Sequence, residues 1–406
     1  MSAQNPIADI VDNGLCTGCG ACVSALKRPD IAMELAEPGY LRPRAAPLSP
    51  AETKTLHAVC AGREIAGRQL DAKADYHPVW GPIVTLATGH ATDPQVRYRG
   101  SSGGVISALA IALIESGAVE FVLATHADPD EPLGNVTRAL GSREEILAAA
   151  GSRYAPSSPL ADLETHLAKG RKFAVIGKPC DIASLRRMAR HDPRIDALIP
   201  YKLAFFCAGV PSRAGTVEVL RALGVERQAV ATFQYRGNGW PGLAKATLHS
   251  GEEASMDYNS SWGQILNRHL QFRCKICPDG TGESADVVCA DAWYGADGYP
   301  DFTERDGRSL IVARTQAGQA LVDQVANEGR VAMDPLPVAD IALMQPYQLL
   351  RKSNVVARLI GLWMARRHIP RFRGLKLLRL ATRTSPETQA RNLWGTFRRS
   401  GGKRLT

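Results

Sequence analysis

The chain has 406 residues, of which 45% are hydrophobic and 22% are charged, and its formal net charge is +9. This length allows two or three domains with a substantial core, and the globular composition excludes an intrinsically disordered chain. Charged residues and glycine interrupt the longest apolar stretch, residues 105–125, so we expect no transmembrane helix. The N-terminus lacks the basic and apolar regions of a secretory signal. We therefore expect a cytoplasmic protein, in which nine cysteines favour metal binding over disulfides.

A cysteine loop is the main feature of the first segment, residues 1–75. Its sequence "CTGCGAC" has the C-x2-C-x2-C spacing of a bacterial ferredoxin, in which thiolates reach separate irons of one 4Fe-4S cube. Gly18 and Gly20 let the backbone fold around such a cluster. The ligands predicted from this loop are Cys16, Cys19 and Cys22.

The fourth ligand of this predicted cluster must come from elsewhere, because Leu26 occupies the position of the next ferredoxin cysteine. Cys60 is the nearest candidate, and we assign it as the fourth ligand. The alternative is that Cys60 is an inert buried thiol, which would leave one iron open. The proline-rich residues 37–50 are expected to be coil.

Residues 76–225 alternate predicted strands and helices, which indicates an α/β core with a largely parallel sheet. We expect strands at residues 83–91, 121–127, 172–180 and 201–209. We expect helices at residues 105–117, 143–151, 160–170 and 181–190, and a loop at residues 97–104.

The loop "SSGG" before the first of these helices has the features of a pyrophosphate seat. Serine hydroxyls cap free N–H groups, glycines admit close approach of the backbone to a ligand, and the helix N-terminus favours an anion. The alternative is a simple helix cap. Further along, Arg153 and Lys178 are cations suited to phosphate, and Tyr154 is suited to stacking on an isoalloxazine or adenine ring. The seat consists of Ser101, Ser102, Gly103 and Gly104.

A second cysteine group begins at "CKIC", residues 274–277, whose C-x2-C spacing supplies two ligands. Two more cysteines each end a predicted strand, where an α/β sheet presents functional groups. We therefore predict a second 4Fe-4S cluster, with zinc bound by the same four thiolates as the alternative. Cys289 is the spare and is expected to be a buried small residue. The four predicted ligands are Cys180, Cys207, Cys274 and Cys277.

Residues 226–340 are expected to form strands at 231–250 and 309–318 in an α+β region. The remaining residues, 341–406, form a basic tail: residues 351–406 carry a net charge of +14, whereas the preceding residues sum to −5. Apolar residues interleave this charge, as in an amphipathic segment on an acidic partner or on the anionic inner face of a membrane. The alternative is a helical hairpin packed on the core with a solvated basic face. Nucleic acid is not expected, because no binding module accompanies the charge.

Seven segments in this order closely resemble the coenzyme F-420 (F420) hydrogenase/dehydrogenase beta-subunit family. They are "CTGCGAC", "SSGGVISALA", "GSRYAPS", "VIGKPCDIASLRR", "FFCAG", "YRGNGWPG" and "CKICPDGTGESADVVCADAW". This family includes beta subunits of deazaflavin-reducing hydrogenases, ferredoxin-using divinyl chlorophyllide 8-vinyl reductases and 7-hydroxymethyl chlorophyll a reductase. The resemblance covers roughly residues 10–320, so the basic tail inherits no role from it.

The resemblance implies an iron–sulfur flavoprotein with noncovalently bound FAD. Family members carry cysteines that match those of the predicted second cluster. The expected fold is therefore α/β, α+β overall, with a ferredoxin-like N-terminal insert, a mixed α/β FAD-binding core and a basic helical tail. Besides the SSGG loop, the FAD environment that the resemblance implies comprises Ser152, Arg153, Tyr154, Lys178, Asn238 and Trp240.

The leading hypothesis is an oxidoreductase that passes electrons between two 4Fe-4S clusters and FAD, since a flavin converts between one-electron and two-electron steps. Ferredoxin or coenzyme F420 would be the redox partner of an unidentified organic substrate. No histidine or carboxylate stands out as a proton donor, so no catalytic residue is named. The alternatives are a non-catalytic electron-transfer adaptor that docks on a partner oxidoreductase or membrane, and a zinc-stabilised scaffold. These expectations are also compatible with a homo-oligomer.

Overall fold

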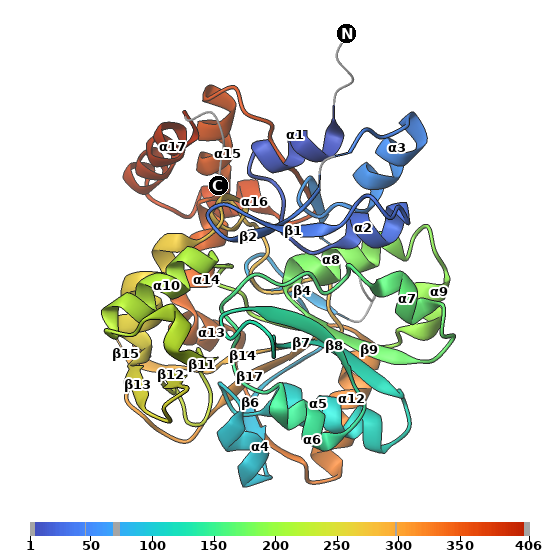
Figure 1. Cartoon of the computed structure of the whole chain (residues 1–406). Helices are drawn as coiled ribbons and strands as arrows, with labels where there is room; N and C mark the ends of the chain where they lie inside the picture. Colours follow the sequence, from blue (N-terminus) through green and yellow to red (C-terminus); the bar gives the residue numbers. More distant parts are fainter. Residues whose placement is uncertain (1–4, 45, 68–73, 297–298, 402–406) are drawn as a thin grey trace.

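A mixed sheet forms the centre of the computed structural model, which describes residues 5–44, 46–67, 74–296 and 299–401 (Figure 1). In this described part of the chain the sheet has eight strands, in the order β18-β6-β17-β14-β10-β9-β7-β8. The strands are β6 (Thr85–Ala91), β7 (Phe121–Ala127), β8 (Asn135–Leu140), β9 (Phe173–Gly177), β10 (Lys202–Phe205), β14 (Val287–Asp291), β17 (Ser309–Ala313) and β18 (Val331–Pro335).

The prediction of a mixed α/β core is confirmed, but the prediction of a largely parallel sheet is wrong. Only the neighbours β14, β10, β9 and β7 run parallel, and the pairs outside them are antiparallel. A parallel pair needs a crossover of a dozen or more residues, whereas the short segment 128–134 joins β7 to β8 as a hairpin. The parallel strands therefore occupy the middle of the sheet.

Helices cover both faces of this sheet because successive strand residues point to opposite sides. In β10, Leu203 packs in the apolar cluster built with α5 and α12, whereas Ala204 packs in the cluster built with α8. Figure 1 shows α5 and α12 below the sheet and α8 above it. The helices of this part are α4 (Pro94–Arg99), α5 (Val105–Glu115), α6 (Arg143–Ala148), α7 (Leu163–Leu167), α8 (Pro179–Met188), α9 (Arg194–Leu198) and α12 (Gln316–Asn327).

Several predicted boundaries in this part differ from the structure, and three of them bear on the site. The expected strand at 201–209 ends at Phe205, so that Cys207 lies beyond the strand and does not end it. The expected loop at 97–104 is shorter, because the Asp93 side chain caps α4 and the helix continues through Arg99. The expected strand at 172–180 ends at Gly177, so that Cys180 lies in the first turn of α8.

The N-terminal segment packs above α8 in Figure 1. Its expected coil at 37–50 is partly wrong, because β2 pairs with β1 in an antiparallel hairpin whose turn uses Gly39 at φ +107°. The elements here are α1 (Pro6–Asp12), α2 (Ala21–Leu26), β1 (Met33–Ala36), β2 (Tyr40–Pro43), α3 (Pro50–Val59) and β3 (Glu64–Ala66). The antiparallel hairpin of β4 (Asp75–His77) and β5 (Gly81–Ile83) follows, and β4 lies below α8 in Figure 1.

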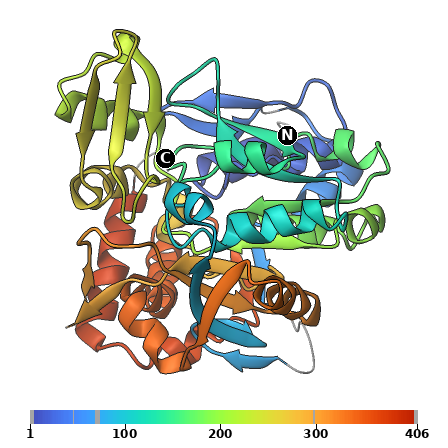
Figure 2. The same cartoon turned by 90° about the horizontal axis from the view of Figure 1, so that it is seen from below.

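A small three-stranded antiparallel sheet stands at one side of the molecule (Figure 2). The expected strand region 231–250 is two of its strands, β11 (Val230–Gln234) and β12 (Ala244–Leu248), separated by a glycine-rich loop. The remaining elements of this region are α10 (Arg213–Ala222), η1 (Arg227–Ala229), β13 (Glu253–Met256), the π-helix η2 (Asn259–Ile265), η3 (Leu266–His269), α11 (Phe272–Lys275), β15 (Tyr294–Ala296) and β16 (Tyr299–Asp301).

The basic tail is helical, as predicted, and it packs on the rest of the protein. Its strand β19 runs parallel to β3, and the buried Lys352 ammonium forms an ion pair with the buried Glu283 carboxylate. These contacts support the packed hairpin over a free amphipathic segment. No helix in the described residues is long and apolar enough to cross a membrane. The elements are η4 (Val338–Asp340), α13 (Ile341–Met344), α14 (Pro346–Ser353), α15 (Val355–Met364), β19 (Arg371–Arg373), α16 (Leu377–Ala381) and α17 (Pro386–Ser400).

Candidate cofactor site

A cavity of about 280 Å³ opens at the carboxyl ends of the parallel strands. Residues at the ends of β7, β9, β10 and β14 line it, together with the N-terminus of α5. In sheets of this kind ligands bind outside the carboxyl ends of the strands. The cavity is therefore the main candidate binding site. Of the predicted cofactor residues, those that line it are Ser101, Ser102, Gly104, Ser152, Arg153, Tyr154 and Lys178.

The serine–glycine loop, residues 101–104, lies at the N-terminus of α5, but its serines do not cap that helix. The N-cap is Gly104 at φ +74°, and no side chain caps the first turn. The Ser102 hydroxyl is instead 3.0 Å from the carbonyl oxygen of Arg308, and the Gly103 N–H donates to Ser309 Oγ at 2.9 Å. The prediction that serine caps the helix is therefore wrong. The uncapped N–H groups of α5 beside the cavity fit an anionic phosphate.

Gly103 does not line the cavity, because it faces the sheet. A Cβ at this position would lie 2.7 Å from the Gly89 carbonyl oxygen and from the Ser309 nitrogen. Gly103 thus lets the loop pack directly on β6 and β17.

Arg153 and Lys178 reach the cavity but are held by other protein groups. Arg153 donates to Asn135 Oδ1 at 2.8 Å and to the Phe233 carbonyl oxygen at 2.7 Å. Lys178 Nζ lies 2.8 Å from Asp181 Oδ2, and both side chains are buried. Burial, the largest single effect, opposes the charged form of Lys178. The Asp181 carboxylate together with Cys180 and Cys207 outweighs burial, so the pKa of this lysine is raised. Both cations therefore line the cavity while bound to other protein groups.

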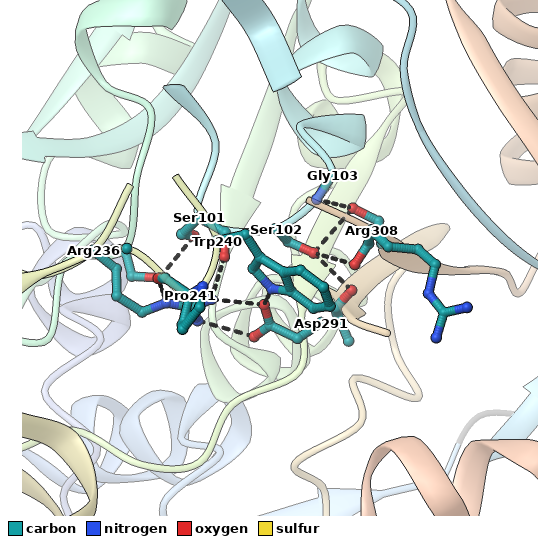
Figure 3. Close-up of polar contacts among 12 residues, drawn as sticks. Ser101, Ser102, Gly103, Arg236, Trp240, Pro241, Asp291 and Arg308 are labelled. Carbon is teal, nitrogen blue, oxygen red and sulfur yellow. Dashed lines mark hydrogen bonds and ion pairs between the residues drawn. The ribbon is translucent and has the colours of Figure 1, made fainter. Parts of the chain in front are cut away.

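Arg236 and Asp291 form a buried ion pair in the wall that the sequence analysis did not single out (Figure 3). Arg236 Nη2 lies 2.8 Å from Asp291 Oδ1 and also donates to the Ser101 carbonyl oxygen. The pair thereby ties the serine–glycine loop to the end of β14. Both residues fall within the motifs "YRGNGWPG" and "CADAW", which is the signal that could have identified them.

Trp240 and Asn238 are not among the residues that line the cavity. Trp240 Nε1 donates to Asp291 Oδ1 at 2.7 Å, and its ring stacks on Trp293 with centroids 4.7 Å apart. Asn238 donates to Gln234 Oε1 at 2.7 Å. Trp240 therefore supports the wall through Asp291 and Trp293, both of which line the cavity.

The first cysteine group converges on a second, smaller space. All four predicted ligands, from the loop and from the end of α3, line a cavity of about 30 Å³. Gly18 and Gly20 have φ angles of +77° and +81°, as the tight loop requires. Burial raises the pKa of the Cys19 thiol to about 11. The residues that share this space are Cys16, Cys19, Cys22 and Cys60.

The second cysteine group also comes together. Burial raises the pKa of the Cys180 thiol, and the nearby Asp181, Cys207 and Cys274 raise it further, whereas Lys178 lowers it. Burial likewise raises the pKa of Cys207, with Cys274 and Cys277 as neighbours that add to the effect. Geometry joins two of them directly, because Arg351 donates to the carbonyl oxygens of both Cys207 and Cys274. Cys180, in the first turn of α8, and Cys277, directly after α11, are the other two members of the group.

The two cysteine groups and the large cavity are neighbours. The buried Gln271 amide donates to the Thr17 carbonyl oxygen in the first loop at 3.2 Å and to Cys274 Sγ at 3.5 Å. Cys207 belongs to the second group and also lines the large cavity. The order in space is thus first group, second group, cavity. The spare Cys289 is buried as predicted and forms part of the cavity wall.

Within the described ranges of the chain, no group of three or more His, Cys, Asp or Glu side chains is arranged to hold a metal ion. A single ion needs its ligands to converge on one point, with Zn–S bonds of about 2.3 Å. A 4Fe-4S cube instead bonds each thiolate to a different iron and so needs sulfurs arranged around a space. The four thiols around the 30 Å³ cavity fit the second requirement.

Comparison with known proteins places the chain in an oxidoreductase family. The family model "Coenzyme F420 hydrogenase/dehydrogenase, beta subunit N-term" matches residues 86–164, and the companion model for the C-terminal part of the same protein matches residues 170–338. The chain belongs to this coenzyme F420 hydrogenase/dehydrogenase beta-subunit family, as its motifs predicted.

Curated relatives are similar at low identity. The beta subunit of coenzyme F420 hydrogenase from Methanococcus voltae is 24% identical over 62% of this chain and 84% of its own length. Coenzyme F420-dependent sulfite reductase from Methanocaldococcus jannaschii is 23% identical over 78% of this chain, which spans 47% of that enzyme. The chloroplastic 7-hydroxymethyl chlorophyll a reductase of Oryza sativa is 22% identical over 60% of this chain and 50% of its own length.

A chain of the F420-reducing NiFe hydrogenase complex from Methanosarcina barkeri has a similar fold. The TM-score is 0.52 at 19% identity, covering 70% of this chain and 96% of that chain. The two chains therefore share a mixed α/β fold.

Proposed function

We propose that this chain is an iron–sulfur flavoprotein oxidoreductase that passes electrons between two 4Fe-4S clusters and FAD. The observation that carries the proposal is that the two cysteine groups and the large cavity lie next to one another. Gln271 contacts both cysteine groups, and Cys207 belongs to the second group and to the cavity wall. Short steps between adjacent sites are what an electron relay requires. Family membership supports the redox character of the function.

The first cluster would be held by Cys16, Cys19, Cys22 and Cys60, and the second by Cys180, Cys207, Cys274 and Cys277. Backbone N–H groups at both sites donate to sulfur: Gly18 donates to Cys16 Sγ and Val210 to Cys274 Sγ, each at 3.4 Å. Such hydrogen bonds stabilise the thiolate over the thiol and tune a cluster's potential.

FAD would occupy the large cavity, with its pyrophosphate at the N-terminus of α5. When bound, a flavin supplies the exchange between one-electron and two-electron steps. The protein's own contribution is to orient this ligand and exclude water. The aromatic side chains of Tyr258, Trp262 and Trp293 line the cavity and give it a partly apolar wall for a planar ring.

Coenzyme F420 or reduced ferredoxin would be the redox partner. F420 is favoured by the names of the relatives from Methanococcus voltae and Methanocaldococcus jannaschii. Anaerobic rapid mixing tests this: the cofactor-loaded chain should oxidise reduced F420 or reduced ferredoxin while its own iron–sulfur absorbance bleaches. Chain stripped of cofactors is the control. Bleaching by neither donor would contradict the proposal.

A second candidate function is an electron-transfer adaptor without a substrate of its own. The similar solved chain is part of a hydrogenase complex, and this observation favours a chain that works with a partner protein. Turnover of F420 with a small-molecule acceptor by the isolated chain would support the enzyme. Turnover only in the presence of a co-purifying protein would support the adaptor.

A further inference from the structure

Helix α14 brings a buried arginine from the basic tail to the second cysteine group. Arg351 Nη1 donates to the Cys207 carbonyl oxygen at 2.8 Å, and Nη2 donates to the Cys274 carbonyl oxygen at 2.6 Å. Only 3% of this residue is exposed. The tail lies outside residues 86–338, which the family models match, so the position follows from this structure and not from the family.

Arg351 differs from its neighbour Lys352 in having no carboxylate partner. Lys352 pairs with Glu283, whereas no ion pair of Arg351 occurs in the described part of the chain. Its Nε is buried and has no hydrogen-bond partner among the described residues. A buried cation without an anion is costly, and a buried N–H normally finds an acceptor. A negative charge beside this guanidinium would therefore stabilise the buried cation.

The groups that face Arg351 identify where that charge would lie. The Tyr347 ring is 5.8 Å from its guanidinium carbon, and the cysteines whose charges act on it are Cys207, Cys274 and Cys277. Arg358 is also close and adds a like charge, although it donates to the Lys275 carbonyl oxygen. Thiolates carrying a cluster are the available source of negative charge.

We propose that Arg351 is a positioning residue that raises the reduction potential of the cluster held by the second cysteine group. This inference rests on the proposed function, because it requires that cluster. Reduction adds one electron to the cluster with no bond made or broken and no proton taken up. A fixed positive charge stabilises the more negative reduced form, so its loss lowers the potential.

The experiment is an anaerobic redox titration followed by EPR, using Arg351→Gln in the full-length, cofactor-loaded chain. The signal of the second cluster is the one that Cys274→Ala removes. We expect the potential of this signal to shift to more negative values in Arg351→Gln, to return towards wild type in Arg351→Lys, and to stay unchanged in Arg391→Gln. Arg391 is an exposed residue of α17, so its substitution removes the same charge without touching the site.

An unchanged potential in Arg351→Gln overturns the inference while leaving the proposed function standing. Absence of the second cluster's signal from the wild-type protein overturns the proposed function instead. If Arg351→Gln does not fold, wild-type protein containing 15N-arginine can be measured by ENDOR. A 15N coupling to the reduced cluster that disappears in Arg351→Lys supports the inference, and the absence of any such coupling overturns it.

Discussion

Individual cysteines provide the most direct test of the two separate groups. Cys16→Ala removes a side chain from the 30 Å³ cavity, and Cys274→Ala removes one from the group beside β10. We expect each substitution to abolish one cluster and spare the other, as measured by iron content and EPR. Cys289→Ala is the matched control and should retain both clusters. Loss of the same signal in both variants would contradict the partition.

The Arg236–Asp291 pair predicts a residue-level effect on stability. Asp291→Asn leaves a buried guanidinium without its counter-charge, because only 2% of the Arg236 side chain is exposed. We expect the free energy of unfolding to fall by about 3 kcal/mol. Asp301→Asn, which breaks the exposed pair with Arg305, should cost less than about 1 kcal/mol. Denaturant unfolding of both variants measures the difference, and equal losses would show that the buried pair has no special role.

At the level of elements, the serine–glycine loop depends on its contact with β6 and β17. Gly103→Ala places a Cβ 2.7 Å from backbone atoms of Gly89 and Ser309, so the loop must move. We expect a loss of about 1–3 kcal/mol in the free energy of unfolding and weaker flavin binding. In the control Gly141→Ala the new Cβ has no neighbour nearer than 3.7 Å, so stability and flavin affinity should be retained. Flavin fluorescence titration and thermal unfolding measure both, and unimpaired flavin binding by Gly103→Ala would contradict this role of the loop.

The elements predicted best are those with strong local signals. The expected helix at 105–117 is observed at Val105–Glu115, because glycines bound its apolar run. The expected strand at 121–127 is observed over the same residues, because acidic residues bound its largely apolar run. The hairpin strand Tyr40–Pro43 was missed because it lies in a proline-rich segment, and proline within a run argues against a strand. β14 was missed although its residues are buried and apolar, since periodicity alone does not distinguish such a strand.

The candidate site was predictable to a different degree in each part. Ligand spacing identified "CTGCGAC" and "CKIC" because bonding geometry restricts where cysteines can stand. The observed contacts of the serine–glycine loop could not be predicted, because those of Ser102 with Arg308 and of Gly103 with Ser309 join residues far apart in the sequence. The ion pair of Arg236 and Asp291 was not predicted for the same reason, because it also joins residues far apart in the sequence.

For the whole molecule, the packed tail predicts that the basic segment is required for folding. Deleting residues 351–406 leaves the buried Glu283 without Lys352 and removes β19 from its pairing with β3. We expect the truncated chain to lose its native circular dichroism and cooperative unfolding. The full-length double variant Trp363→Ser with Trp394→Ser should keep both, because 68% and 55% of these residues are exposed. A cooperatively folded truncated protein would show that the tail is an appendage.

The central claim is that cysteines distant in sequence hold two clusters next to a flavin in one chain. The most direct test is anaerobic purification of the full-length chain with iron, acid-labile sulfide and flavin quantified per polypeptide. The account predicts iron and sulfide for two four-iron clusters and one noncovalent FAD. Zinc without labile sulfide, or a folded chain that binds no flavin on anaerobic reconstitution, would contradict it.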